Sequence, residues 1–210
     1  MSAPAQYRHG DMLRSRSVSD VVLHAQVTVP APPERLRLDW QHEVNRNLQL
    51  QAGDVEVLPL ARARARWADY RHCVQAAADW TQSVGLNDLL NHSDIALMAC
   101  RGAAPHHDGA QYGAFAFCNL FLSDDKGLDL HFVNLGLRIP LQRGTVVIFD
   151  TWQAHELVAR GSACFDASDF PEERDLTQVF LTWELPIDNS QLAKLLCVQF
   201  DTPSPLNADC

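Results

Sequence analysis

The sequence is short of positive charge. It contains 17 Lys and Arg residues against 26 Asp and Glu residues, which gives a formal net charge of -9 at pH 7. A protein that covers the phosphate backbone of a nucleic acid needs a large basic surface. The charge balance therefore argues against nucleic acid as a partner.

The sequence also lacks closely spaced cysteines and long apolar runs. None of its six cysteines forms a CxxC pair, and stretches such as "FAFCNLFL" and "KLLCVQF" are typical of buried free thiols in a reducing compartment. No stretch reaches the length of about 18 apolar residues that a membrane-spanning helix needs. The N-terminal "MSAPAQYRHGDMLRSRSVSD" lacks the apolar segment of a secretory signal. We therefore expect a cytoplasmic protein with no membrane partner.

A chain of 210 residues has the length of one domain with a full hydrophobic core. From residue 94 onward, short segments rich in β-branched and aromatic residues alternate with glycine, proline or acidic turns, and this rhythm predicts an antiparallel barrel or sandwich. We expect the core to occupy residues 94–186. A loosely ordered segment 1–19, supporting strands and helices in 20–93 and a C-terminal segment 187–210 complete the predicted domain.

Three stretches before the core have sequence patterns that predict secondary structure. "DVVLHAQVTV" (20–29) has the composition of a strand. In "RWADYRHCVQAAADWTQSVGL" the apolar residues recur with helical spacing, which predicts a helix that ends at Gly85. "VEVLPLARARAR" (55–66) combines a strand pattern with alternating arginines, and we interpret it as a solvated sheet edge.

Two His-x-Asp triplets lie at or within the boundaries of the predicted core, "HSD" at 92–94 and "HHD" at 106–108. Positions i and i+2 of a strand point to the same side, so the His and Asp of such a triplet can bind one metal ion. A histidine from a distant strand would complete the two-His-one-carboxylate set that leaves positions open for a cosubstrate and oxygen at ferrous iron. His155, in "RGTVVIFDTWQAHELVARG", is the candidate because a short loop delivers it to the start of a strand. We interpret "HSD" as turn chemistry before the strand "IALMAC".

The order of elements around the second triplet resembles the core of the 2-oxoglutarate/Fe(II)-dependent oxygenases. In that family the His-x-Asp motif precedes a strand, a turn with G-x-L-x-F, a G-x-x-x-x-F strand and the distal histidine. This chain has "HHD", "FAFCNLFLSD", "KGLDLHF", "RGTVVIF" and "AHELV" in the same order between His106 and Leu185. The resemblance implies a mainly β fold with flanking helices, in which the core is a double-stranded β-helix (jelly-roll) barrel.

The resemblance also implies a ligand set and cofactors. His106, Asp108 and His155 would be the catalytic metal ligands for Fe(II), with 2-oxoglutarate as cosubstrate and O2 as oxidant. Family members hold the far carboxylate of 2-oxoglutarate with an Arg or Lys, because a guanidinium pairs with a carboxylate in bidentate fashion. Arg174 is the candidate if residues 162–173 loop out, and Arg160 is the alternative.

Three further residues are candidates for contacting ligands. Asn119 is a lone amide among the aromatic residues of "FAFCNLFL", so it would either bind the 2-oxoglutarate carboxylate or hydrogen-bond to the backbone of the core. His107, between the two expected ligands, and Trp152, in the loop before the distal histidine, are candidates for facing the substrate.

Several functions follow from this interpretation. The first hypothesis is an oxygenase that hydroxylates an unactivated C–H bond of a small molecule, such as an amino acid or natural-product intermediate, and releases succinate and CO2. Hydroxylation of a protein side chain, as in prolyl hydroxylases, is the alternative within the family. A non-enzymatic metal-binding or sensor barrel of cupin type is the alternative outside it, although "HHDGAQ" lacks the H-x-H pair and following Glu of cupins. The sequence leaves the oligomeric state open.

Overall fold

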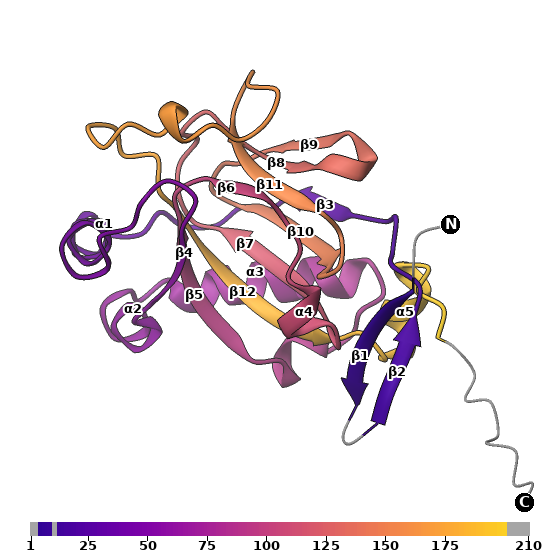
Figure 1. Ribbon diagram of the computed structural model, residues 1–210. Helices are drawn as coiled ribbons and strands as arrows, with labels where there is room; N and C mark the ends of the chain where they lie inside the picture. Colours follow the sequence, from indigo (N-terminus) through magenta and orange to yellow (C-terminus); the bar gives the residue numbers. More distant parts are fainter. Residues whose placement is uncertain (1–3, 10–11, 201–210) are drawn as a thin grey trace, which may run out of the picture.

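The computed structural model describes residues 4–9 and 12–200, and its centre is a pair of antiparallel sheets that face each other (Figure 1). The strands of the larger sheet are, in spatial order, β3 (Leu23–Gln26), β10 (Thr145–Asp150), β7 (Phe115–Phe121), β12 (Gln178–Pro186), β5 (Ile95–Cys100) and β4 (Val55–Leu58). The strands of the smaller sheet are β6 (Ala103–His106), β11 (His155–Ala159), β8 (Leu128–Phe132) and β9 (Leu137–Pro140).

The chain passes back and forth between these sheets. β5, β7, β10 and β12 belong to the larger sheet, whereas β6, β8, β9 and β11 belong to the smaller one. This alternation is the arrangement of a double-stranded β-helix, or jelly roll. The predicted fold class is confirmed, and each of the β-rich segments named from residue 94 onward contains a strand.

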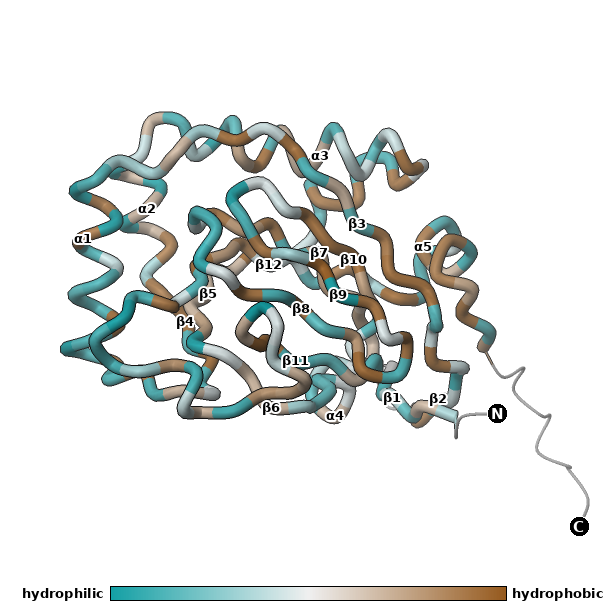
Figure 2. Tube along the Cα trace, turned by 90° about the horizontal axis from the view of Figure 1, so that it is seen from above, coloured by the Kyte–Doolittle hydropathy of each residue, from teal (hydrophilic) through white to brown (hydrophobic). Residues whose placement is uncertain are grey.

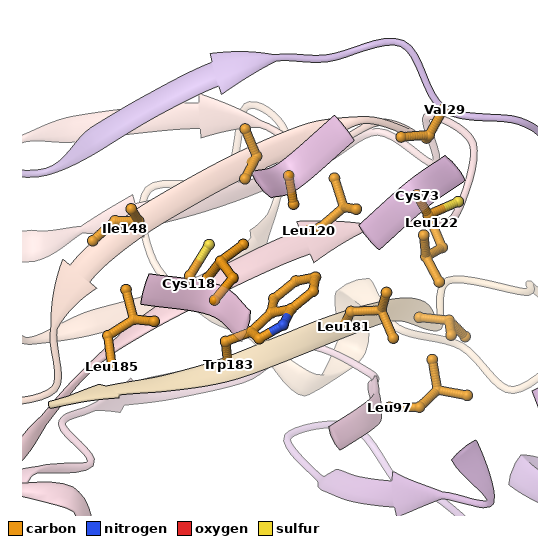
Figure 3. Close-up of a cluster of buried hydrophobic side chains, with 14 of the residues drawn as sticks. Val29, Cys73, Leu97, Cys118, Leu120, Leu122, Ile148, Leu181, Trp183 and Leu185 are labelled. Carbon is orange, nitrogen blue, oxygen red and sulfur yellow. The ribbon is translucent and has the colours of Figure 1, made fainter. Parts of the chain in front are cut away.

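Period-two alternation divides the side chains of the larger sheet between two apolar clusters. On β7 and β12, the residues Cys118, Leu120, Leu181 and Trp183 belong to a cluster that the helices complete (Figure 3). The intervening residues of the same strands, such as Phe121 and Phe180, belong to a second cluster that lies against the smaller sheet. The hydropathy colours of Figure 2 show β10, which contributes to both clusters, as hydrophobic along most of its length. The space between the two sheets is where a ligand can be enclosed.

The helices flank this core. They are α1 (Glu34–His42), which continues into a π-helical segment (Glu43–Leu48), α2 (Leu60–Arg66), α3 (Tyr70–Ser83), α4 (Gly109–Tyr112) and α5 (Ser190–Leu195), with short 3-10 turns at Leu89–His92, Val133–Leu135 and Ala167–Asp169. The predicted helix before Gly85 is confirmed as α3, and Gly85 adopts the left-handed conformation (φ 91°) typical of a helix C-terminus. No helix in the described part of the chain has the length and apolarity to cross a membrane.

Two local predictions are wrong. The alternating Ala and Arg residues form helix α2 rather than a sheet edge, because Pro59 ends β4 and stands at the N-cap of a run of good helix formers. The described part of segment 1–19 is not loosely ordered. It contains a hairpin of β1 (Ala5–His9) and β2 (Met12–Arg16), whose last residue, Arg16, is fully buried.

Candidate metal centre

Three side chains converge at one end of the space between the sheets. His106 ends β6 and His155 begins β11, and these two residues are directly paired across the two strands. Asp108 follows two residues after His106, at the start of α4. One potential ligand atom from each residue lies within 4.8 Å of the other two. The structure thus brings together the three residues that were predicted as metal ligands.

The hydrogen bonds of the two histidines fix which ring nitrogen is free. Nδ1 of His106 lies 2.8 Å from the carbonyl oxygen of Ala104, and Nδ1 of His155 lies 2.9 Å from that of Gln153. A carbonyl oxygen only accepts, so in the neutral form of each ring the proton is on Nδ1 and Nε2 has the free lone pair. The Nε2 atoms lie 3.7 Å and 3.6 Å from the two carboxylate oxygens of Asp108.

The electrostatics of this group favour a bound cation. Burial lowers the pKa of His155, although the carboxylate of Asp108 acts in the opposite direction. A neutral imidazole is the form that binds a metal ion. Within the described residues, Asp108 has no Lys or Arg partner, because its ion contacts are with the two imidazoles alone. A divalent ion would supply the missing positive charge, so the donor set fits Fe(II).

The loops that carry Asp108 and His155 are joined to each other. The amide of Asp108 donates to the carbonyl of Thr151 (2.8 Å), and the Thr151 hydroxyl donates to the carbonyls of Tyr112 and Phe115. The carboxylate of Asp150 accepts from the Trp152 amide (3.1 Å). These bonds hold two ligands from distant parts of the sequence in a fixed relation.

A buried ion pair anchors the same loops to the N-terminal hairpin. Both guanidinium NH2 groups of Arg16 donate to the carboxylate of Asp150 at 2.7 Å, and both side chains are fully buried. Arg16 also donates to the carbonyl of Gly113, and the amide of Ser19 donates to Asp150. The N-terminal hairpin therefore stabilises the loops that carry the metal ligands. The sequence alone did not indicate this contact.

The two residues predicted to face the substrate do not line the cavity. The ring of His107 stacks on that of Trp152 with the centroids 4.8 Å apart, and His107 is exposed. A Cβ atom placed on Gly109 would overlap the Trp152 ring. Trp152 therefore packs against α4, because glycine leaves it the space there.

A cavity of about 600 Å³ extends from the metal ligands into the space between the sheets. Its inner wall is apolar, with side chains such as Leu130 and Phe180. Its polar lining contains Asn119 and Thr182, together with three acidic residues besides Asp108, namely Asp54, Glu56 and Glu184. Burial, with a contribution from Asp94, raises the pKa of Glu184. The residues that line the cavity, all from the described part of the chain, include no Lys or Arg.

The structure places neither arginine candidate in this cavity. Arg174 is exposed in the loop before β12, and its carbonyl accepts from Arg101. Arg160 binds Asp125 and Asp129 at the far end of β11. The loop after β11 is longer than the prediction assumed, since β12 begins only at Gln178, so Arg174 stays outside the sheet. Of the candidates for the cosubstrate carboxylate, the structure brings Asn119 alone to the cavity.

No family model and no curated protein sequence matches the chain. The chain is similar to solved structures of 2-oxoglutarate/Fe(II) oxygenases. One is the viral collagen prolyl hydroxylase of Paramecium bursaria Chlorella virus-1 in its 2OG complex, at 8% identity and a TM-score of 0.42 over 79% of this chain and 94% of that chain. Another is a Pseudomonas putida prolyl-4-hydroxylase, at 14% identity and a TM-score of 0.41 over 79% and 92%. The non-heme alpha-ketoglutarate-dependent epimerase SnoN from nogalamycin biosynthesis matches at 13% identity and a TM-score of 0.40 over 79% and 78%.

Proposed function

We propose that the protein is an Fe(II)- and 2-oxoglutarate-dependent oxygenase that hydroxylates a C–H bond. The observation that supports this most directly is the convergence of two imidazole Nε2 atoms and the Asp108 carboxylate, which has no Lys or Arg partner among the described residues, at the end of the cavity between the sheets. Three protein ligands on one side of a ferrous ion leave room for a chelating cosubstrate and for oxygen.

His106, Asp108 and His155 would hold the iron. With 2-oxoglutarate and O2, bound Fe(II) supplies the oxidising chemistry that converts a C–H bond to C–OH while the cosubstrate becomes succinate and CO2. The other residues of the chain provide orientation and a water-poor space. The ring centroid of Phe149 lies 4.9 Å from that of His155, so Phe149 shields this metal-binding histidine from water.

A small-molecule substrate fits the cavity best. Its volume of about 600 Å³ lies within the range of small-ligand sites. The carboxylates of Asp54, Glu56 and Glu184 would repel an anionic substrate, so we expect a neutral or positively charged molecule.

A protein side chain is the second candidate substrate, because an edge strand forms part of the cavity wall. Val55 and Val57 of β4 line the cavity while remaining 41% and 61% exposed. Within the described sheet, β4 pairs with β5 alone, so its other edge is open to an extended peptide.

The test of the proposed function is aerobic incubation of the protein with Fe(II) and 2-oxoglutarate, with succinate as the measured product. We expect slow succinate formation without substrate, which His106→Ala and Asp108→Ala each abolish. His92→Ala is the matched control because His92 is exposed and lies outside the cavity. If the protein binds metal but neither binds nor consumes 2-oxoglutarate, the cupin-like alternative replaces this proposal.

A further inference from the structure

Two polar side chains lie next to each other on the cavity face of the larger sheet. Glu184 of β12 is directly opposite Phe117 of β7. Two residues further along each strand, Thr182 is directly opposite Asn119, and all four side chains line the cavity. Glu184 and Asn119 are therefore diagonal neighbours, a relation in which the Cβ atoms of a sheet lie at most about 8 Å apart. One small ligand group placed between these two side chains can contact both.

Asn119 has a buried acceptor atom that the protein itself does not use. The residue is 8% exposed, and its Oδ1 atom has no hydrogen-bond partner among the described residues. Leaving such an atom unpaired in a protein interior is costly. An amide oxygen accepts hydrogen bonds and donates none, so this atom pairs with an N–H or O–H group of a ligand and not with a carboxylate.

The carboxylate of Glu184 lacks a counter-charge. The side chain is half-buried, and the described residues that line the cavity include no Lys or Arg. Burial and then the carboxylate of Asp94 raise the pKa of Glu184, and no positively charged group of the described chain acts in the opposite direction. Asp54 and Glu56, which also line the cavity, add further negative charge. The lining therefore attracts a positively charged ligand group.

Aromatic rings complete the surroundings of this carboxylate. Phe117 is opposite Glu184, and the ring of Tyr112 meets that of Phe117 edge-on, with the centroids 5.0 Å apart. Both rings line the cavity. The face of an aromatic ring attracts an ammonium or guanidinium group, which the carboxylate can hold at the same time.

A second metal ion fits these oxygen atoms less well than an organic cation. Among the described residues, His106, Asp108 and His155 are the one set of three His, Cys, Asp or Glu side chains close enough together to hold a metal ion. Glu184 and the amide of Asn119 offer too few ligands for such an ion. They suffice for the N–H donors of one charged nitrogen group.

The strand pairing puts Glu184 at the metal end of the cavity. Phe117, its partner on β7, is paired in turn with Phe149 of β10, and the ring centroid of Phe149 lies 4.9 Å from that of His155. Neighbouring strands are about 4.8 Å apart, so β12 and β10 are about 10 Å apart. A small aliphatic molecule spans this distance.

We propose that Glu184 and Asn119 form a subsite for a positively charged nitrogen group, an ammonium or guanidinium, of the substrate. The group donates N–H bonds to the carboxylate of Glu184 and to Oδ1 of Asn119 and lies against the rings of Phe117 and Tyr112. This inference rests on the proposed function and adds the substrate class to it, an organic cation with an aliphatic part.

The test compares two probes that have the same shape and differ in charge, N-butylguanidinium and N-butylurea. Both are titrated into the Zn(II)-loaded full chain and followed by ligand-observed NMR. Zn(II) occupies Asp108, so the cation cannot bind there instead. We expect the guanidinium to bind at least about fivefold more tightly than the urea. A smaller preference, or no detectable binding of the guanidinium, would overturn the inference.

A third probe distinguishes the two sources of such a cation. It is an alanine–arginine–alanine tripeptide that is acetylated and amidated at its ends, so that the arginine has the one charge. Tighter binding of the tripeptide than of N-butylguanidinium assigns the cation to the side chain of a peptide. Equal or weaker binding assigns it to a free small molecule, and both outcomes support the subsite.

Two variants test the residues of the subsite. Glu184→Gln removes the charge with little change of shape, so the affinity for N-butylguanidinium should fall at least about fivefold. Glu173→Gln removes the same charge at an exposed loop position outside the cavity, and it should leave the affinity unchanged. Asn119→Leu removes an unpaired polar atom, so it should weaken guanidinium binding without lowering the stability to urea. Unchanged affinity in Glu184→Gln, or lower stability with unchanged affinity in Asn119→Leu, would overturn the assignment.

The failure of this inference differs from failure of the proposed function, because the probes are titrated without 2-oxoglutarate. If N-butylguanidinium binds as expected but Fe(II) and 2-oxoglutarate give no succinate, the proposed function fails and the site remains a site for an organic cation. If succinate forms and the guanidinium is not preferred over the urea, the proposed function stands and the cation subsite is wrong.

Discussion

The buried ion pair between Arg16 and Asp150 offers a sharp test of how the metal centre is supported. In Asp150→Ala the guanidinium of Arg16, which is fully buried, loses both of its 2.7 Å bonds to the carboxylate. Breaking one side of a buried pair costs about 3 to 5 kcal/mol, because the remaining charge stays out of water. For a domain of this size each kcal/mol lowers the melting temperature by about 2 to 4 °C. We therefore expect Tm to fall by about 6 to 20 °C.

We also expect Asp150→Ala to weaken metal binding. The Asp150 carboxylate accepts from the Trp152 amide, and the Asp150 amide donates to the side chain of Gln153, whose carbonyl fixes His155. We expect Mn(II) affinity to fall about tenfold or more in Asp150→Ala under conditions where the variant is still folded.

Urea unfolding and Mn(II) calorimetry measure both effects. Asp125→Asn is the matched control, because it breaks an ion pair with Arg160 in which the two side chains are 43% and 40% exposed. Such a surface pair contributes less than about 1 kcal/mol. A loss below about 1 kcal/mol in Asp150→Ala, equal to that of the control, would refute the reasoning.

Two further predictions test the loop geometry and the burial of the cysteines. Gly109→Ala should displace the Trp152 ring and weaken Mn(II) binding, whereas Ala110→Ser, at the exposed next position, should not; equal metal affinity in both variants would show that Trp152 packing does not position the ligands. Burial raises the pKa of Cys73 and of Cys100 to about 12 and also raises that of Cys118. Iodoacetamide at mildly alkaline pH should therefore leave these three thiols unmodified in the folded protein and modify the exposed Cys164 and Cys197. Peptide mass mapping would show which cysteines have reacted. Equal labelling of the buried and exposed thiols would contradict the burial.

The sequence predicted the parts of the fold that depend on local periodicity. The strand rhythm after residue 94 and the helical spacing before Gly85 both correspond to observed elements. The order of the core strands also led to His106, Asp108 and His155, which the structure brings together. Here the local signal is strong because one face of each element is apolar.

The last strand shows where periodicity is insufficient. Val179, Leu181 and Trp183 form its apolar face, which invites the interpretation that this face lines the barrel. In the structure this face packs toward the helices, and the face with Phe180, Thr182 and Glu184 lines the cavity between the sheets. Alternation identifies two faces, but only the tertiary arrangement decides which of them meets the ligand.

Contacts between residues that are far apart in the sequence were the second feature that could not be predicted. Nothing in "MLRSRS" distinguishes Arg16 from its neighbours, because its partner Asp150 lies 134 positions away in the sequence. The predicted position of Arg174, the candidate for binding the 2-oxoglutarate carboxylate, was wrong for a similar reason. The position of Arg174 in the sequence allowed it to begin a strand, but the loop before β12 keeps it exposed.

The central claim is that one metal ion binds where His106, Asp108 and His155 meet. A crystal structure of the Mn(II)-loaded protein, with the metal located from its anomalous scattering, tests this most directly. The account predicts one strong peak per chain, bonded to Nε2 of both histidines and to the carboxylate of Asp108. A peak bound elsewhere, for example at His92 and Asp94, or a metal that leaves one of the three residues uncoordinated, would contradict it.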